Sequence, residues 1–276
     1  MTNAPYLLPG ARAGYRIGDN SVIDSMMYDG LTCAFDDCAM GLATDRYNQK
    51  LGVTRERQDQ FAAASHAKAA AAIAAGKMAE EIVPVSVPQR KGDPKIVDTD
   101  EGVRADTTFD SLQGLRPAFD KEGTITAGNA SQISDGGAAV IVMSKAKAQE
   151  LGIAPLGELL GFGEVAGPDA SLLTQPSRAI QKALAKANLT AADIDLFEMN
   201  EAFAAVGLAS ADELGIDEAK VNVNGGAIAL GHPLGMSGTR VALTALYELK
   251  RRGGGTAAVA LCGGGGQGDA AIFRSL

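Results

Sequence analysis

Three side chains in the last third of the chain are the best candidates for chemistry. An amide, Asn200, precedes Glu201; an imidazole, His232, lies in a glycine-rich run; and a thiol, Cys262, is followed by four glycines. Small neighbouring residues allow a backbone to approach a ligand closely. An imidazole can donate a hydrogen bond to a carbonyl or accept a thiol proton, and a thiol can act as a nucleophile or a base. The combination suits acyl-thioester chemistry.

Each of these side chains also has an ordinary structural interpretation. Asn200 could cap the helix that follows it, and Cys262 could be a small buried hydrophobe. A lone histidine is more often structural than catalytic. The glycines and the proline around His232 favour a functional role, because they shield it little and let the backbone fold sharply.

The glycines also raise the possibility of a nucleotide site. Gly263, Gly265 and Gly268 satisfy the G-x-G-x-x-G pattern directly after an apolar run. That fingerprint must open a helix and be followed by an acidic residue ~20 positions further on. Here a strand is expected to follow, so the pattern does not indicate dinucleotide binding.

Composition excludes other classes of function. The 276 residues carry a net charge of -8, which argues against a broad surface for nucleic acid or an acidic membrane. No apolar run approaches the ~18 residues that span a bilayer, and the first residues lack a secretion signal, so we expect a cytoplasmic protein. Reduced thiols are then expected for the three cysteines, with Cys33 and Cys38 as packing residues rather than metal ligands.

The elements that must position these side chains follow from hydrophobic periodicity. From residue 134 onward, strands alternate with helices, which predicts an α/β layered domain with helices on both faces of a sheet. Strands are expected at 137–144, 155–165, 194–199, 256–261 and 270–273, and helices at 176–188, 201–214 and 237–252. Further upstream, residues 54–76 predict an alanine-rich helix capped by Thr54, near-helical spacing marks 21–35, and 82–87 reads as a strand.

One internal similarity connects the two ends of this region. Residues 135–141 resemble residues 266–272, since each is a glycine-bearing turn that enters an apolar strand. This indicates two copies of one unit. No matching series of strands and helices precedes residue 135, so the first copy is expected to lack its beginning.

Taken together, Asn-Glu-Ala-Phe at 200–203, the run at 225–235 and Cys-Gly-Gly-Gly-Gly-Gln-Gly at 262–268 closely resemble the thiolases, particularly bacterial acetyl-CoA acetyltransferases. The resemblance covers essentially the whole chain. It implies a layered α/β thiolase-like fold with one complete C-terminal βαβαββ-type half (153–276), a loop domain that covers coenzyme A (1–133), and only the closing strand of the N-terminal half (134–152).

The resemblance also implies catalytic roles. Cys262 matches the cysteine that removes or returns the α-proton of acetyl-CoA. His232 matches the histidine that activates the nucleophile and helps to form an oxyanion hole, and Asn200 matches the residue that holds a water in the other hole. Gly264 falls where the family uses a backbone N–H near the acyl group.

The expected substrates are acetyl-CoA or acetoacetyl-CoA, with no further cofactor and no metal. The resemblance assigns six contacts: Ser131 and Ala127 along the pantetheine, Phe119 and Met40 as apolar walls, Arg104 near the nucleotide, and Phe203 in the acyl pocket. Ala39 departs from many biosynthetic relatives, which have His there, so acyl-chain length is not implied.

The largest departure concerns the nucleophilic cysteine. In the family this cysteine lies upstream of the segment that matches Asn3-Ala4-Pro5 of this chain. Cys33 and Cys38 align elsewhere and lack its Ser-Gly neighbours. The chain is therefore expected to be inactive by itself, and to act as an oligomer or with a segment that supplies the nucleophile. Two alternatives are an inactive CoA-binding or scaffold protein derived from a thiolase, and a hydrolase that uses Cys262, His232 and Asn200.

Overall fold

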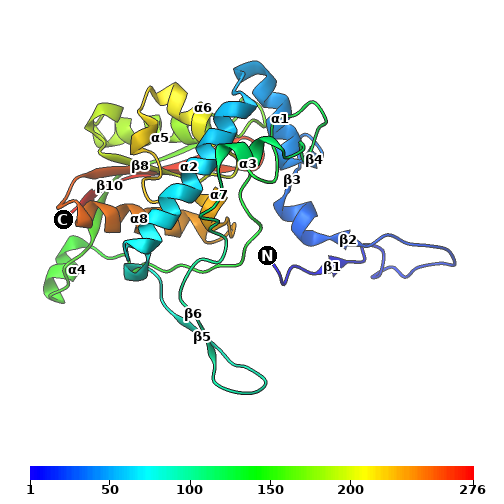
Figure 1. The fold of residues 1–276 in the computed structure, drawn as a ribbon, viewed down its shortest axis with the longest axis horizontal. Helices are drawn as coiled ribbons and strands as arrows, with labels where there is room; N and C mark the ends of the chain where they lie inside the picture. The colour runs from blue at the N-terminus through cyan, green and yellow to red at the C-terminus, as the bar shows by residue number, and fades with distance from the viewer.

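The computed structural model describes residues 1–276 and centres on a four-stranded mixed sheet (Figure 1). Its strands are β7 (Gly157–Ala166), β8 (Leu196–Met199), β9 (Thr256–Gly263) and β10 (Gln267–Ser275). The order across the sheet is β7-β10-β9-β8. Strand β10 is antiparallel to both of its neighbours, whereas β8 and β9 run parallel. The predicted strands at 155–165, 194–199, 256–261 and 270–273 are thus confirmed.

Helices cover both faces of this sheet, as the alternation of elements predicted. Helix α5 (Gln175–Ala187) packs on one face and α8 (Ser237–Arg251) on the other. Side chains alternate along β9: Ala258 and Ala260 belong to the main core with α5, whereas Ala257 and Val259 pack with α8. Because successive side chains of β9 point to opposite faces of the sheet, this one strand contributes residues to both cores.

Helix α5 lies unusually close to the edge strand β7. Any side chain at Gly161 or Gly163 would collide with the carbonyl oxygens of Ala183 and Ala179 in that helix. Only glycine permits this separation. The close packing holds the helix that covers the main core.

The remaining helices comprise one long helix, α2 (Arg55–Ala74), and several shorter ones. Helix α2 is capped by Thr54, whose hydroxyl accepts the N–H of Arg57 at 3.2 Å, and Gly76 follows with a φ of 74°. The others are α1 (Met40–Leu51), α3 (Phe109–Gln113), α4 (Lys145–Glu150), α6 (Ala204–Leu214) and α7 (Ala227–Leu230), with short helical turns at Met26–Gly30, Met78–Glu80, Ala191–Asp193 and Glu218–Lys220. No helix is both long and apolar enough to cross a membrane.

Three small hairpins belong to the first hundred residues. They pair β1 (Tyr6–Leu7) with β2 (Ile23–Asp24), β3 (Thr32–Cys33) with β4 (Cys38–Ala39), and β5 (Val85–Val87) with β6 (Lys95–Val97). The first and the last project from the body as arms (Figure 1). The helix predicted at 21–35 is wrong, because strands β2 and β3 flank a single five-residue helical turn there. Backbone pairing with the rest of each hairpin outweighs the local spacing.

The strand predicted at 137–144 is also wrong. This segment has no ladder partner, and Ile141 and Val142 are each 88% exposed. The expected closing strand of the first unit is therefore present only as an unpaired apolar segment. A strand requires a neighbour to satisfy its N–H and C=O groups, and the sheet of β7–β10 does not reach this segment.

We expect this unpaired segment to cause self-association. Exposed apolar side chains on an open backbone edge favour pairing with another chain. The double substitution Ile141→Lys and Val142→Lys is expected to shift the sedimentation coefficient toward that of a monomer, with Leu51→Lys, at the exposed end of α1, as the control. A wild-type chain that sediments as one stable monomer would contradict the expectation.

Candidate functional site

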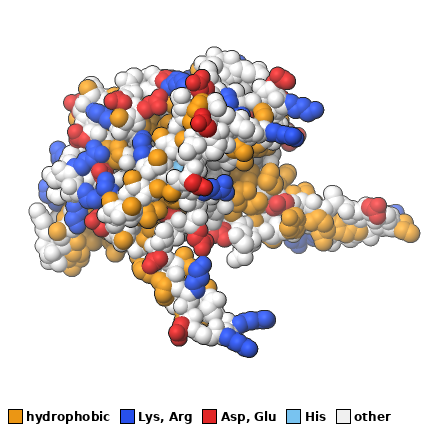
Figure 2. All heavy atoms as spheres, viewed as in Figure 1, with side chains coloured by type: hydrophobic (Ala, Val, Ile, Leu, Met, Phe, Trp, Pro, Cys, Tyr) orange, Lys and Arg blue, Asp and Glu red, His pale blue; other side chains and the backbone are white.

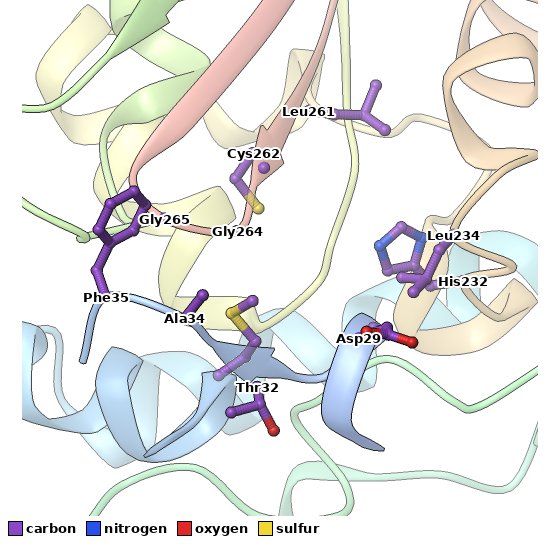
Figure 3. Close-up of a pocket in the computed structure, with 13 residues that line it drawn as sticks. Asp29, Thr32, Ala34, Phe35, His232, Leu234, Leu261, Cys262, Gly264 and Gly265 are labelled. Atoms are coloured by element: carbon purple, nitrogen blue, oxygen red, sulfur yellow. The ribbon is translucent and has the colours of Figure 1, made fainter. Parts of the chain in front are cut away.

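One cavity of the molecule brings together several of the side chains singled out from the sequence. It has a volume of about 410 Å³, and His232, Cys262, Gly264 and Met40 line it. Figure 3 shows the imidazole and the thiol on opposite sides of this space. The other lining residues are Asp29, Gly30, Thr32, Ala34, Phe35, Leu234, Leu261, Gly263 and Gly265.

Cys262 lies near the end of β9, where it pairs with Gly268 of β10. The turn between the strands contains Gly265 and Gly266 with φ values of 80° and 75°, which a side chain would strain. The strand therefore delivers the thiol to the cavity, and the turn brings the backbone of Gly264 beside it. Burial raises the pKa of the Cys262 thiol to about 12, so the thiol is protonated at neutral pH.

His232 follows the short helix α7 and is placed by its backbone. Its N–H donates to the carbonyl of Gln132 at 3.1 Å. Gly231 has a φ of 93°, and a side chain there would collide with Ser134. A glycine is therefore required at this turn, and the turn sets the backbone position of His232.

Both ring nitrogens of His232 have partners. Nε2 lies 3.2 Å from Nδ2 of Asn200, and Nδ1 lies 2.6 Å from Oγ of Ser237. Asn200 is fully buried at the end of β8, where its N–H donates to Ala260 of β9. Burial, followed by the positive charge of Arg240, lowers the pKa of His232 to about 4. The ring is therefore neutral above pH 5.

Glu201, next to Asn200, turns away from the cavity. Its Oε1 accepts from Nδ2 of Asn222 at 2.7 Å, and its Oε2 accepts from the Ser65 hydroxyl at 2.7 Å and the Ile228 N–H at 3.0 Å. The carboxylate thus joins α2, the 222 turn and α7. It supports the segment that carries His232.

The residues that the resemblance assigned to coenzyme A do not all line the cavity. Phe119 and Phe203 form an edge-to-face pair with ring centres 6.3 Å apart, and the N–H of Ser131 donates to the carbonyl of Ala202 at 3.0 Å. These three residues therefore gather around the 200–203 turn rather than at the thiol.

Arg104 and Ala127 are exposed and lie outside the cavity lining. The backbone N–H of Arg104 donates to Nδ1 of His66 at 3.2 Å. Their roles toward coenzyme A remain predictions.

Sequence reasoning missed two parts of the site. One is the wall formed by Asp29, Thr32 and Phe35, which comes from a segment interpreted as a helix. The other is Ser237, which served only as the start of α8 although it lies five residues after His232, close enough to reach back across the first turn. That spacing was the available signal.

The remaining cysteines belong to a small separate core cluster. Cys33 is fully buried and packs with Ala43 and Ala170, and Cys38 packs against this small cluster. Neither residue lines the cavity.

Comparisons with known proteins agree across sequence and structure. The family model described as the thiolase N-terminal domain matches residues 1–146, and that of the thiolase C-terminal domain matches residues 153–275. A "Probable acetyl-CoA acetyltransferase" of Mycolicibacterium smegmatis is 59% identical over 99% of this chain and 71% of its own length. The "Acetyl-CoA acetyltransferase" of Thiocystis violacea is 51% identical over 100% of this chain and 70% of its own.

Solved structures show the same fold. The acetyl-CoA acetyltransferase of Bacillus anthracis superposes with a TM-score of 0.94 at 39% identity, over 99% of this chain and 68% of that one. Human mitochondrial 3-ketoacyl-CoA thiolase also gives a TM-score of 0.94, at 40% identity over 100% of this chain and 69% of that one.

Proposed function

Because this chain belongs to the thiolase family, we propose that it takes part in the acetyl-CoA acetyltransferase reaction, the reversible thiolysis of acetoacetyl-CoA to two molecules of acetyl-CoA. The observation that carries the proposal is the cavity shared by the Cys262 thiol and the His232 imidazole, beside the glycine turn at 263–266. A thiol, an imidazole donor and a close backbone are the groups that thioester chemistry needs.

In this proposal Cys262 handles the α-proton. Thiolysis breaks the bond between C2 and C3 of acetoacetyl-CoA, transfers the acetyl group to an acceptor thiolate, and leaves an enolate of acetyl-CoA. The Cys262 thiol gives that enolate its proton, and the thiolate formed then takes up the proton of the coenzyme A that accepts the acetyl group. A thiol with a pKa of about 12 rests in the protonated form that this direction requires.

His232 and Asn200 are assigned to the thioester oxygen. A neutral imidazole can donate to that oxygen as negative charge develops on it, and such donors are worth about 10²–10³-fold in rate. The low pKa of His232 keeps the ring neutral. Met40 extends the lining of the cavity on the acyl side, and Phe119, Phe203 and Ser131 are proposed to contact the coenzyme A substrate beyond it.

The acceptor thiol is proposed to come from polypeptide outside these 276 residues. Cys33 is buried in the β3–β4 hairpin, and neither it nor Cys38 lines the cavity with Cys262. A buried structural cysteine is inert as a nucleophile. By itself the chain therefore has no second thiol in this cavity to hold the acetyl intermediate while Cys262 handles the α-proton.

Complementation tests this proposal. The purified chain is mixed with the N-terminal segment of the M. smegmatis relative that this chain does not match, and acetoacetyl-CoA consumption is followed with and without coenzyme A. Turnover is expected only in the mixture. Turnover by the chain alone would contradict the external thiol. Coenzyme A binding by calorimetry without turnover in the mixture would favour a CoA-binding protein.

A further inference from the structure

Cys33 and Cys38 face each other across the β3–β4 hairpin. The register of the two strands pairs the Cα atoms of these residues directly. The connecting loop, residues 34–37, ends at Asp37, whose φ of 48° is left-handed. A short loop with a defined turn sets the register of a hairpin, and a slip by one residue would put the thiols on opposite faces. The two thiols are therefore held as cross-strand neighbours.

The hydrogen bonds of the hairpin set the separation of this pair. The N–H of Met40 donates to the carbonyl of Leu31 at 2.9 Å, two residues along each strand from the cysteines. Hydrogen-bonded pairs recur at every second residue of an antiparallel ladder, so Cys33 and Cys38 form one too, with Cα atoms about 5.5 Å apart. Disulfides usually join Cα atoms about 4.4–6.8 Å apart. The backbone thus already has the spacing of a disulfide.

Both side chains belong to the same small cluster. Cys33 is fully buried with Ala43 and Ala170, and Cys38 packs against these residues from a partly exposed position. Opposed side chains share one face of a ladder, with Cβ atoms about 4.5–5.5 Å apart. A disulfide needs about 3.5–4.5 Å, so bond formation must draw the strands slightly together. A disulfide formed under such strain is readily reduced again.

Each sulfur has a hydrogen-bond donor beside it. The guanidinium of Arg46 donates to the Cys38 sulfur at 3.7 Å, and the N–H of Asp36 donates to the Cys33 sulfur at 3.5 Å. Burial raises the pKa of Cys38, the charge of Arg46 opposes this rise, and the loop carboxylates of residues 36 and 37 add to it. Because the thiolate is the reactive form, Cys38 is expected to react faster as the pH rises above neutral.

We propose that Cys33 and Cys38 are a modification site, at which hydrogen peroxide converts the two thiols to a reversible disulfide that closes the β3–β4 hairpin. Cys38 reacts first, because it is the partly exposed thiol of the pair. Cys33 is closed to dissolved reagents, but its target is the residue directly opposite it. Cys262 is spared, since burial raises the pKa of its thiol to about 12.

The oxidation balances in two steps. The Cys38 thiolate attacks one oxygen of the peroxide, so that an S–O bond forms, the O–O bond breaks, and the other oxygen leaves as hydroxide and becomes water. The Cys33 sulfur then attacks the sulfenic sulfur of Cys38. The S–S bond forms, the S–O bond breaks, and a second water leaves with the Cys33 proton. The two sulfurs together give two electrons to the peroxide.

The hairpin also forms part of the wall of the substrate cavity. Thr32, Ala34 and Phe35 line that cavity, whereas the two cysteines of the hairpin do not (Figure 3). A disulfide that draws the strands together would shift this wall and leave the Cys262 thiol unmodified. Its effect would therefore fall on substrate binding.

Peptide mapping of the chain alone tests the site. The chain is treated with hydrogen peroxide, its free thiols are blocked with iodoacetamide, and it is cleaved before Asp36 and Asp37, between the two cysteines. In the oxidised wild type, the two fragments are expected to remain joined until dithiothreitol separates them. Fragments that separate without a reductant, or a disulfide that contains Cys262, would overturn the proposal.

A matched variant tests the register rather than the number of thiols. Cys38→Ser combined with Ala39→Cys moves the second thiol one residue along β4, opposite Thr32 and on the other face. This variant should form no disulfide with Cys33 under the same conditions, while Cys262→Ala should form it as the wild type does. Equal linkage in the shifted variant, with a native circular dichroism spectrum, would contradict the inference.

The effect on the cavity rests on the proposed function and has its own readout. The chain is oxidised, freed of peroxide, and only then mixed with the N-terminal segment of the M. smegmatis relative. Oxidation is expected to raise KM for acetoacetyl-CoA several-fold with kcat little changed, and dithiothreitol should reverse this. Unchanged kinetics of the linked chain would contradict the effect on the cavity. No turnover by the reduced mixture would contradict the proposed function alone, because the disulfide is measured on the chain by itself.

Discussion

Replacing Cys262 by alanine is expected to lower the rate of acetoacetyl-CoA thiolysis by the complemented enzyme about 10³-fold, because general acid–base groups contribute about 10²–10⁴-fold. Alanine has no thiol proton to give to the enolate, and no other thiol lines this cavity. Acetylation of the external thiol precedes release of the protonated product, so the variant should still bind acetoacetyl-CoA with a similar affinity. Stopped-flow absorbance of acetoacetyl-CoA and calorimetry measure the two effects.

Cys38→Ala is the matched control for this experiment. Its thiol is partly buried in the β3–β4 hairpin and is not part of the cavity lining, and it is not assigned a role in thiolysis. The control should keep wild-type turnover. A Cys262→Ala enzyme within a few-fold of wild type would remove Cys262 from the α-proton step.

The second large effect is expected for stability. Glu201→Gln should lower the free energy of unfolding by about 3 kcal/mol, because breaking a buried, hydrogen-bonded charged network costs about 3–5 kcal/mol. All three partners of this carboxylate, from Asn222, Ser65 and Ile228, are donors. A glutamine offers them one oxygen, and its NH₂ group would face a donor.

Urea unfolding followed by circular dichroism measures this loss in the chain alone. Glu101→Gln is the control, since its side chain is 76% exposed and its ion pair with Lys95 lies on the surface. Such pairs contribute about 0–1 kcal/mol. Equal midpoints for the Glu201→Gln variant and the wild type would show that the network is not important for folding.

Local patterning was sufficient to predict the C-terminal part of the fold. Strand β9 is a continuous run of mostly small apolar residues because both faces of its sheet are covered, and α5 ends at Asn188 in the left-handed conformation. These signals are local, so a single sequence carries them. The sequence motifs also predicted that Cys262 and His232 belong to one site, because each lies beside glycines that let a backbone approach a ligand closely.

Long-range partners were decisive where prediction failed. The apolar run at 137–144 has the composition of a strand, but a strand exists only where another backbone can pair with it. Likewise, residues 29–35 reach the cavity through a hairpin whose pairing no local pattern signals.

The sequence by itself therefore determined the class of chemistry, since the thiol, the imidazole and their glycine turns are properties of short segments. The tertiary structure alone decided the pKa values and the hydrogen-bond partners of these groups. Burial raises the pKa of the Cys262 thiol and lowers the pKa of the His232 ring, so that both groups stay uncharged over a wide range around neutral pH. Ser237 and Asn200 lie on different elements, so they contact the two nitrogens of the ring only after the chain has folded. The pKa of the ring depends on this burial and on these neighbours, which no short segment supplies.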